Sequence, residues 1–186
     1  MEKMSKDPPW YHNPSDTLRI YHGTTSLHRN NFESQGLQIV RRSNKRRDFG
    51  DGFYCTIRLD QARDYARQTA VAVGENGHSL IVVCEISVQK LYDLTPHIII
   101  TEYDYRWLDI IKQGRWQNVD LPYQWIYGRC GDGRTRDIQQ LFEQGIDDDT
   151  LLSRLMPSPT APFNQYDQLW FGSVEALSAV HIVDYW

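Results

Sequence analysis

The sequence predicts an α+β fold of short, mostly antiparallel strands with peripheral helices. Strand-like and helix-like segments are interspersed, without the strict alternation typical of a parallel α/β sheet. Residues 80–86 form a strongly apolar run, which is typical of a central buried strand. The chain has 186 residues, of which 40% are hydrophobic, so its length and composition suit one domain with a sizeable core.

The predicted strands are short and bounded by turn residues. In chain order they cover residues 17–21, 37–40, 53–56, 80–86, 91–94, 125–128, 167–171 and 180–183. Residues 98–100 fit either a strand or the approach to a helix. The strand over 17–21 is expected to end at His22, and no internal repeat is visible.

Helical periodicity is clearest after Asp60, where Ala62, Ala66, Ala70 and Val73 recur on one face. This face of small residues is expected to pack on a sheet. Further helices are predicted over residues 26–34, 107–111, 135–144, 147–155 and 174–177. Residues 1–16 are rich in proline and predict an extended arm, and residues 17–186 predict a single domain.

Composition limits the classes of function. The net charge of −4 argues against a general nucleic-acid binder, and no apolar run approaches the roughly 20 residues of a membrane span. The polar N-terminus lacks the hydrophobic segment of a signal peptide, so we expect a cytoplasmic protein, or one delivered into a host cell without a cleaved signal. The three cysteines fit neither a disulfide framework nor a metal site, and we expect a monomer without a metal.

The stretch Asp48–Thr56, with the sequence DFGDGFYCT, combines a turn with a strand. Two glycines permit a tight turn and close approach to another group, and the aspartates favour the same turn through their side chains. Alternation along the strand places Tyr54 and Thr56 on one face and Phe53 and Cys55 on the other. The stretch therefore predicts that an aromatic hydroxyl is delivered to the wall of a pocket.

Four short motifs follow one another along the chain, each occurring once. They are Tyr21–Gly23, Asp48–Thr56, Trp125–Asp132 and Asp167–Phe171. With these motifs the sequence resembles the ADP-ribosyltransferases of the diphtheria-toxin-like class, whose signature is a His-Tyr-Glu triad on three strands. It is similar to a group of small bacterial and fungal domains in that superfamily, over about residues 18–183. The resemblance implies two packed sheets that form an NAD cleft.

The resemblance also assigns roles to residues of the first two motifs. It implies that His22 hydrogen-bonds the adenosine-side ribose of NAD and that the Gly23 backbone holds the nicotinamide amide. It implies that Tyr54 stacks on the nicotinamide ring, and such stacking on a pyridinium contributes about 0.5–2 kcal/mol. The expected NAD-binding set is His22, Gly23, Thr24, Arg41, Arg46, Gly52, Phe53 and Tyr54. The arginines belong to a basic run, 41–47, that is either a solvated loop or a pyrophosphate contact.

The third motif departs from the family pattern, because Gln168 stands where the family has its glutamate. A glutamine can orient a ribose hydroxyl through its carbonyl, but it supplies no full charge and cannot act as a base. The catalytic set is then His22, Tyr54 and Gln168. Either the nucleophile is already reactive or another carboxylate assists, and Asp167, Glu102, Asp51 and Glu175 remain open for that role.

The resemblance implies a mono-ADP-ribosyltransferase that moves ADP-ribose from NAD to an acceptor, expected to be a protein, with release of nicotinamide. Such an enzyme could serve as a toxin or an effector. NAD glycohydrolase is a second enzymatic interpretation, and a catalytically silent module that binds NAD or ADP-ribose is a third. An RNA 2′-phosphotransferase is disfavoured, because it would need a basic face around the site.

Overall fold

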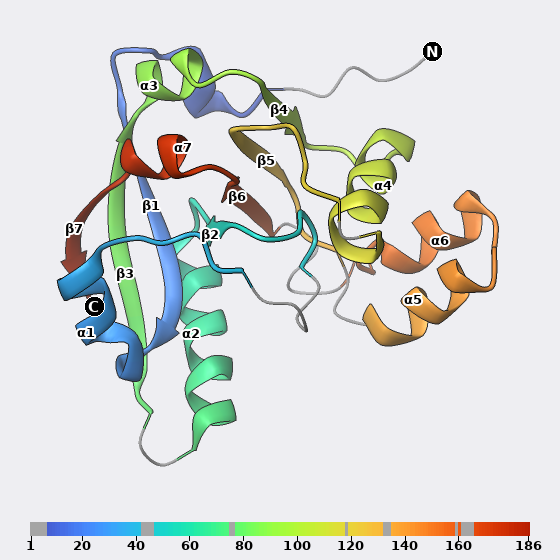
Figure 1. Cartoon of the computed structure of the whole chain (residues 1–186), viewed down its shortest axis with the longest axis horizontal. Helices are drawn as coiled ribbons and strands as arrows, with labels where there is room; N and C mark the ends of the chain where they lie inside the picture. The colour runs from blue at the N-terminus through green and yellow to red at the C-terminus, as the bar shows by residue number, and fades with distance from the viewer. Residues whose placement is uncertain are drawn as a thin grey trace.

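The structure is a computed structural model and describes residues 7–41, 47–74, 77–117, 119–131, 135–158, 160 and 166–186 (Figure 1). The described residues form an α+β fold with one three-stranded and one four-stranded sheet. The predicted fold class is therefore confirmed.

The first sheet has the order β1-β3-β7 and is antiparallel throughout. Its strands are β1 (Thr17–Thr25), β3 (Ser79–Ser87) and β7 (His181–Tyr185). The apolar run predicted as a central strand is β3, which pairs with β1 over its whole length. The strand β1 is longer than predicted, because its pairing continues through His22, Gly23 and Thr24 to Thr25.

The second sheet has the order β2-β6-β5-β4. Its strands are β2 (Phe53–Cys55), β6 (Asp167–Phe171), β5 (Trp125–Arg129) and β4 (His97–Ile100). The β4–β5 pair is parallel and the other two pairs are antiparallel. The ambiguous run at residues 98–100 is thus a strand.

The two sheets meet where β1 passes β2. Tyr21 and Thr56 form an isolated antiparallel bridge, with N–H···O distances of 2.8 and 2.9 Å between their backbones. The bridge fixes the first motif beside the second.

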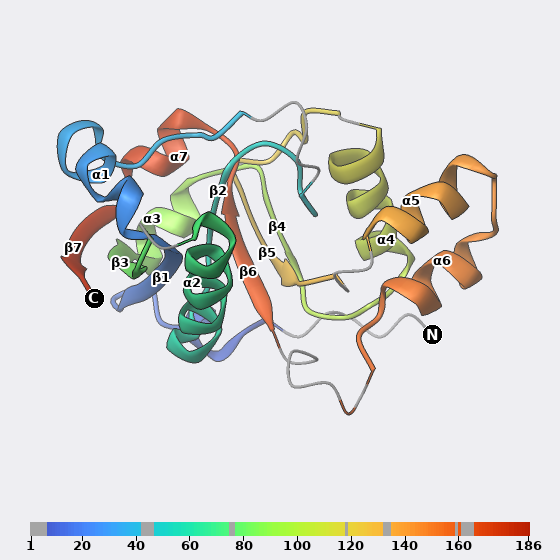
Figure 2. The same ribbon diagram turned by 90° about the horizontal axis from the view of Figure 1, so that it is seen from below.

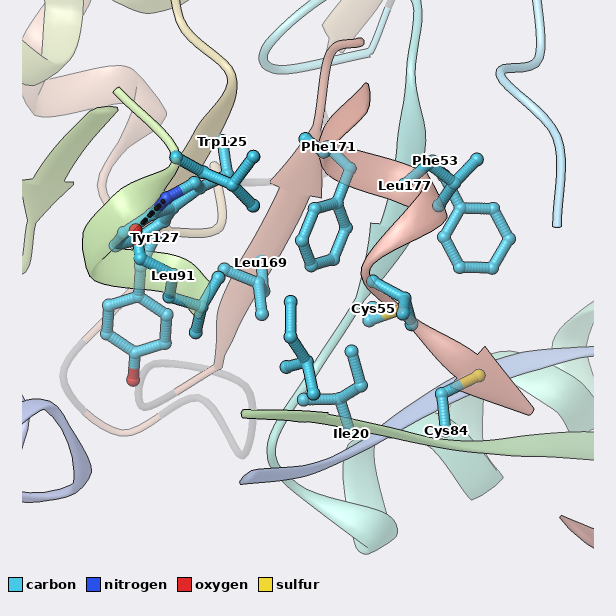
Figure 3. Packing of buried hydrophobic residues seen from close by; sticks show 14 of the residues in the cluster. Ile20, Phe53, Cys55, Cys84, Leu91, Trp125, Tyr127, Leu169, Phe171 and Leu177 are labelled. Carbon is cyan, nitrogen blue, oxygen red and sulfur yellow. Dashed lines mark hydrogen bonds between the residues drawn. The ribbon is translucent and has the colours of Figure 1, made fainter. Parts of the chain in front are cut away.

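A hydrophobic core fills the space between the sheets (Figure 3). Ile20 and Cys84 from the first sheet lie toward Cys55, Leu169 and the other inward residues of the second. Trp125 joins this core and donates from its indole nitrogen to the Leu91 carbonyl at 2.9 Å. Cys55 is buried here, and burial raises the pKa of its thiol, as expected for an inert core cysteine.

Helices cover the outer faces of both sheets. The helix α2 (Leu59–Val73) packs Ala62 and Ala66 against β1 and β3, as its face of small residues predicts. The outer face of the second sheet packs against α4 (Tyr105–Ile111), α5 (Thr135–Glu143) and α6 (Asp148–Leu155). Figure 2 shows these three helices on the opposite side of the molecule from α1 (Arg29–Gln35) and β7.

The remaining helices are short. They are the 3-10 turns Pro9–His12 and Ser26–His28, α3 (Val88–Asp93), the π-helix Lys112–Trp116 and α7 (Val174–Ser178). In the part of the chain that the structure describes, no helix has the length and apolar character needed to cross a bilayer.

Three sequence-based predictions are corrected. Residues 91–94 were expected to be a strand, but most of them lie in α3, whose apolar Val88 and Leu91 are buried together at helical spacing. Residues 37–40 form only an isolated bridge from Val40 to Gly52. The expected extended arm is, in its described part, a 3-10 turn whose Trp10 and Tyr11 pack on the core between the sheets.

Candidate functional site

The Tyr54 hydroxyl closes the turn that precedes its own strand. The Phe49 N–H donates to the hydroxyl at 3.0 Å, and the hydroxyl donates to the Gly50 carbonyl at 2.7 Å. The rings of Phe49 and Tyr54 are stacked, with their centroids 6.4 Å apart. Burial raises the pKa of Tyr54 well above its usual value, so the phenol stays protonated at neutral pH.

The two glycines of the central motif make close contacts within the protein. Gly50 has a φ of +76° and packs against the backbone of Gly114. A methyl group at Gly52 would lie 1.9 Å from Nε1 of Trp170, whose N–H donates to the Asp51 carbonyl at 3.1 Å. The close approach predicted for these glycines is therefore to Gly114 and Trp170.

His22 lies where the first and second motifs meet. Its Nδ1 is 2.7 Å from the Tyr54 carbonyl, and its ring stacks on Phe53 with centroids 4.7 Å apart. A carbonyl oxygen only accepts, so Nδ1 carries the proton and donates it. Burial lowers the pKa of His22 to about 4, and the nearby charge of Arg47 acts in the same direction. His22 is therefore neutral at pH 7, with Nε2 as an acceptor.

Gln168 lies on β6, on the same face as Tyr54. Tyr54 pairs directly with Trp170, and Gln168 precedes Trp170 by two residues, so all three side chains share one face of the second sheet. The Gln168 side-chain NH₂ has two hydrogen-bond acceptors: Nε2 lies 2.7 Å from Asp48 Oδ2 and 3.3 Å from the Arg129 carbonyl. Among the described residues, none donates a hydrogen bond to Gln168 Oε1.

Asp48 is the buried carboxylate that contacts Gln168. Arg115 NH1 donates to its Oδ1 at 2.7 Å, and the Gly131 N–H donates to its Oδ2 at 2.9 Å. The side chains of Arg115 and Asp48 are only 8% and 13% exposed, so solvent does little to screen this ion pair. The Asp48 side chain was predicted to stabilise its own turn, but it binds three distant groups instead.

The π-helix Lys112–Trp116 delivers Arg115 to this carboxylate. Gly114 in the same helix lets its backbone approach the central motif, since a methyl group there would lie 2.6 Å from the Phe49 carbonyl carbon. The helix predicted over residues 107–111 continues beyond Ile111 and through Gly114 with π geometry. Such π-helical segments often occur at functional sites.

The basic run contributes one described side chain close to the expected triad. The guanidinium carbon of Arg47 lies 5.2 Å from the centre of the Tyr54 ring, within cation–π range. Arg41 is exposed and borders a separate cavity of about 180 Å³ together with Asp51 and Trp170. Arg46, which was also expected to bind NAD, lies outside the described residues.

Other residues of the expected NAD-binding set have packing roles. A methyl group at Gly23 would lie 2.2 Å from the Ala62 carbonyl oxygen, so this glycine permits contact between β1 and α2. Thr24 is 5% exposed and pairs with Leu80. Phe53 is 2% exposed, within the core between the sheets and against His22.

Among the described residues, the carboxylate that contacts Gln168 is Asp48, and none of the four considered from sequence hydrogen-bonds it. Asp167 lies on the opposite face of β6, where it accepts from Thr56 at 3.2 Å and from Tyr127. The Thr56 side chain was predicted to share a strand face with Tyr54, but it contacts Asp167 on the other face, because β2 ends at Cys55. Glu102 borders a cavity of about 370 Å³ together with Asp167 and Arg129. Glu175 lies on α7, where its carboxylate is 3.5 Å from Gln124 Nε2. Sequence reasoning missed Asp48, although it stands in the same motif as Tyr54.

The family comparison covers nearly the whole chain. A family model described as a protein of unknown function (DUF3990) matches residues 18–182. The chain belongs to the DUF3990 family. No curated protein matches the chain. The matched range of this DUF3990 domain includes His22, Tyr54, Asp48 and Gln168.

The chemistry available in this part of the DUF3990 domain is hydrogen bonding and stacking by neutral groups. His22 offers an acceptor nitrogen, Tyr54 an aromatic face and Gln168 a carbonyl oxygen. The charge of Asp48 is balanced by Arg115 behind them. In the described ranges there is no group of three or more side chains suited to holding a metal ion.

Proposed function

We propose that this DUF3990 domain is a mono-ADP-ribosyltransferase that transfers ADP-ribose from NAD to a protein acceptor and releases nicotinamide. The observation that carries the proposal is the junction of the three signature motifs. His22 on β1 bonds the Tyr54 carbonyl on β2 at 2.7 Å, and Gln168 lies on the adjoining strand β6 on the face of Tyr54. The ordered motifs of the resemblance thus belong to three neighbouring strands.

In this proposal His22 holds a ribose of NAD as a neutral hydrogen-bond partner. Its Nδ1 proton is committed to the Tyr54 carbonyl, so Nε2 accepts a ribose hydroxyl proton. The pKa lowered to about 4 keeps this role intact across the neutral range.

Tyr54 supplies the stacking surface for the nicotinamide ring. Its hydroxyl is fixed by the backbone of Phe49 and Gly50, so the phenol takes no part in proton transfer. Arg47 is 5.2 Å from the centre of the ring, where a cation is favoured. A pyridinium would take the place of this guanidinium, and Arg47 would then be free to meet the pyrophosphate.

Gln168 holds a hydroxyl of the reacting ribose through Oε1. The bond from the anomeric ribose carbon to the nicotinamide nitrogen breaks with its electron pair leaving on nicotinamide. The acceptor forms the new bond to that carbon and gives up its proton to solvent water. A neutral amide stabilises the developing positive charge less than a carboxylate does.

A silent module that binds NAD or ADP-ribose is the second candidate. The observation that favours it is the neutral Gln168, whose nearest carboxylate is already paired with Arg115. NAD glycohydrolase remains the second enzymatic candidate.

Incubation with NAD labelled in its adenosine half separates these functions. The transferase would label proteins of an added cell lysate, and His22→Ala would abolish that labelling. Free labelled ADP-ribose without labelled protein would indicate the glycohydrolase. Labelled NAD that binds but stays intact would indicate the silent module.

A further inference from the structure

We propose that Asp48 is a positioning residue that orients the Gln168 amide and so directs Oε1 toward the ligand. This inference rests on the proposed function, because the ligand hydroxyl that Oε1 would accept belongs to the reacting ribose. It adds to the site a residue that the triad motif does not include.

The orientation follows from the hydrogen-bond inventory of the amide. The NH₂ group of Gln168 has two protons, and its two acceptors are Asp48 Oδ2 at 2.7 Å and the Arg129 carbonyl at 3.3 Å. The flipped amide would bring Oε1 against the carboxylate, which has no proton to donate. Asp48 therefore selects a single orientation.

The carboxylate is itself fixed from the other side. Arg115 and the Gly131 N–H occupy its two oxygens at 2.7 and 2.9 Å, and both side chains of the ion pair are largely shielded from solvent. Asp48 cannot rotate to release Gln168 without leaving the Arg115 charge unpaired in the interior. The π-helix that carries Arg115 thus acts on Gln168 through Asp48.

This arrangement explains why a glutamine suits position 168. A carboxylate there would lie against Asp48 at hydrogen-bond distance, and two such groups cannot both ionise without a large penalty. Of these two side chains only Asp48 is charged, and the Gln168 amide accepts the hydrogen bond from the ligand hydroxyl through Oε1.

A charge exchange between the two positions tests the proposal in the full-length protein. Compared with the wild type at the same pH, Gln168→Glu alone should lower the melting temperature by about 10 °C at pH 7.5. The difference should largely disappear near pH 5, where the new carboxyl is protonated. Adding Asp48→Asn should remove this pH-dependent loss, because the new amide can donate to the new carboxylate. Asp167→Asn is the matched control, since it removes a neighbouring buried carboxylate on the opposite face of β6 and should give no rescue.

Nicotinamide release from NAD is the second readout on the same proteins. Asp48→Asn alone and Gln168→Glu alone should each lower release about 100-fold, as misorientation of a reacting group does. The exchanged pair should recover most of that loss, which a purely structural role for Asp48 would not produce.

The two readouts separate the two proposals. A Gln168→Glu protein as stable as the wild type at pH 7.5, or an exchanged pair with no rescue in either readout, would overturn the role of Asp48 even if the wild type releases nicotinamide. Wild-type protein without release, but with the expected melting temperatures, would overturn the proposed function and leave the Asp48–Gln168 contact supported.

Discussion

Asp48 and Gln168 stand 120 residues apart in the sequence, and Gln168 Nε2 donates to Asp48 Oδ2 at 2.7 Å. This contact ties the turn of the central motif to the third motif on β6. Asp48 in turn pairs with Arg115, whose NH1 lies 2.7 Å from its Oδ1 at the base of the candidate site.

Removing the Arg115 charge should destabilise the protein strongly. Arg115→Met leaves the Asp48 carboxylate buried without its cation, which typically costs about 3–5 kcal/mol of unfolding free energy. Lys112→Met is the control. The Lys112 side chain is 18% exposed, but its partner Asp148 is 44% exposed and stays hydrated when the cation is removed, so the change should cost no more than about 1 kcal/mol. Urea unfolding measures both, and similar costs for the two variants would contradict a buried role for Arg115.

His22 should make stability dependent on pH. In the unfolded chain its pKa is near 6.5 and in the folded protein it is lowered to about 4, so below pH 6.5 the unfolded state binds the extra proton. The stability is complete above pH 6.5, and up to about 3 kcal/mol is lost as pH falls to 4. His22→Asn keeps a donor for the Tyr54 carbonyl without ionising, so its unfolding free energy should fall less over this range. Equal pH profiles would refute this assignment.

Gly23 should resist substitution because of packing. Gly23→Ala puts a methyl group 2.2 Å from the Ala62 carbonyl oxygen, and overpacking against backbone typically costs about 1–3 kcal/mol. Val71→Ala, on the exposed face of α2 at a side chain that is 82% exposed, should change the unfolding free energy by less than about 0.5 kcal/mol. Thermal unfolding of both variants measures these costs. A Gly23→Ala protein as stable as the wild type would show that α2 does not pack this closely on β1.

Gly52 and Trp170 should be energetically coupled. Gly52→Ala would collide with the indole, at 1.9 Å from Nε1, and should cost about 2 kcal/mol. In a Trp170→Phe background the smaller ring leaves room for the methyl group, so the same change should cost at least about 1 kcal/mol less. A double-mutant cycle by urea unfolding measures the coupling, and additive effects would argue against this contact.

The sequence predicts those parts of the fold that local patterns determine. The central strand β3 and the buried face of α2 follow from an apolar run and from the spacing of Ala62 and Ala66. The α3 segment was assigned wrongly, because a short apolar run at Leu91 fits a strand as well as a helical turn until its packing is known.

The candidate site was predictable only in part. The strand positions of Tyr54 and Gln168 follow from their motifs, and their shared face follows once β2 and β6 are paired. The Arg115–Asp48 pair joins residues 67 positions apart, and the spacing of the motifs contains no signal for it. Tertiary packing therefore places a carboxylate against Gln168 that local sequence patterns do not indicate.

Nicotinamide release from NAD by the purified protein, with and without cell lysate, tests the proposed function most directly. A transferase should release nicotinamide in a lysate-dependent manner, and release should fall to background in both His22→Ala and Tyr54→Ala. The Val71→Ala protein should release nicotinamide as the wild type does, and the melting temperature of each variant shows that it is folded. An absence of release from wild-type protein in both conditions would contradict the proposed function, and NAD binding without release would indicate the silent module.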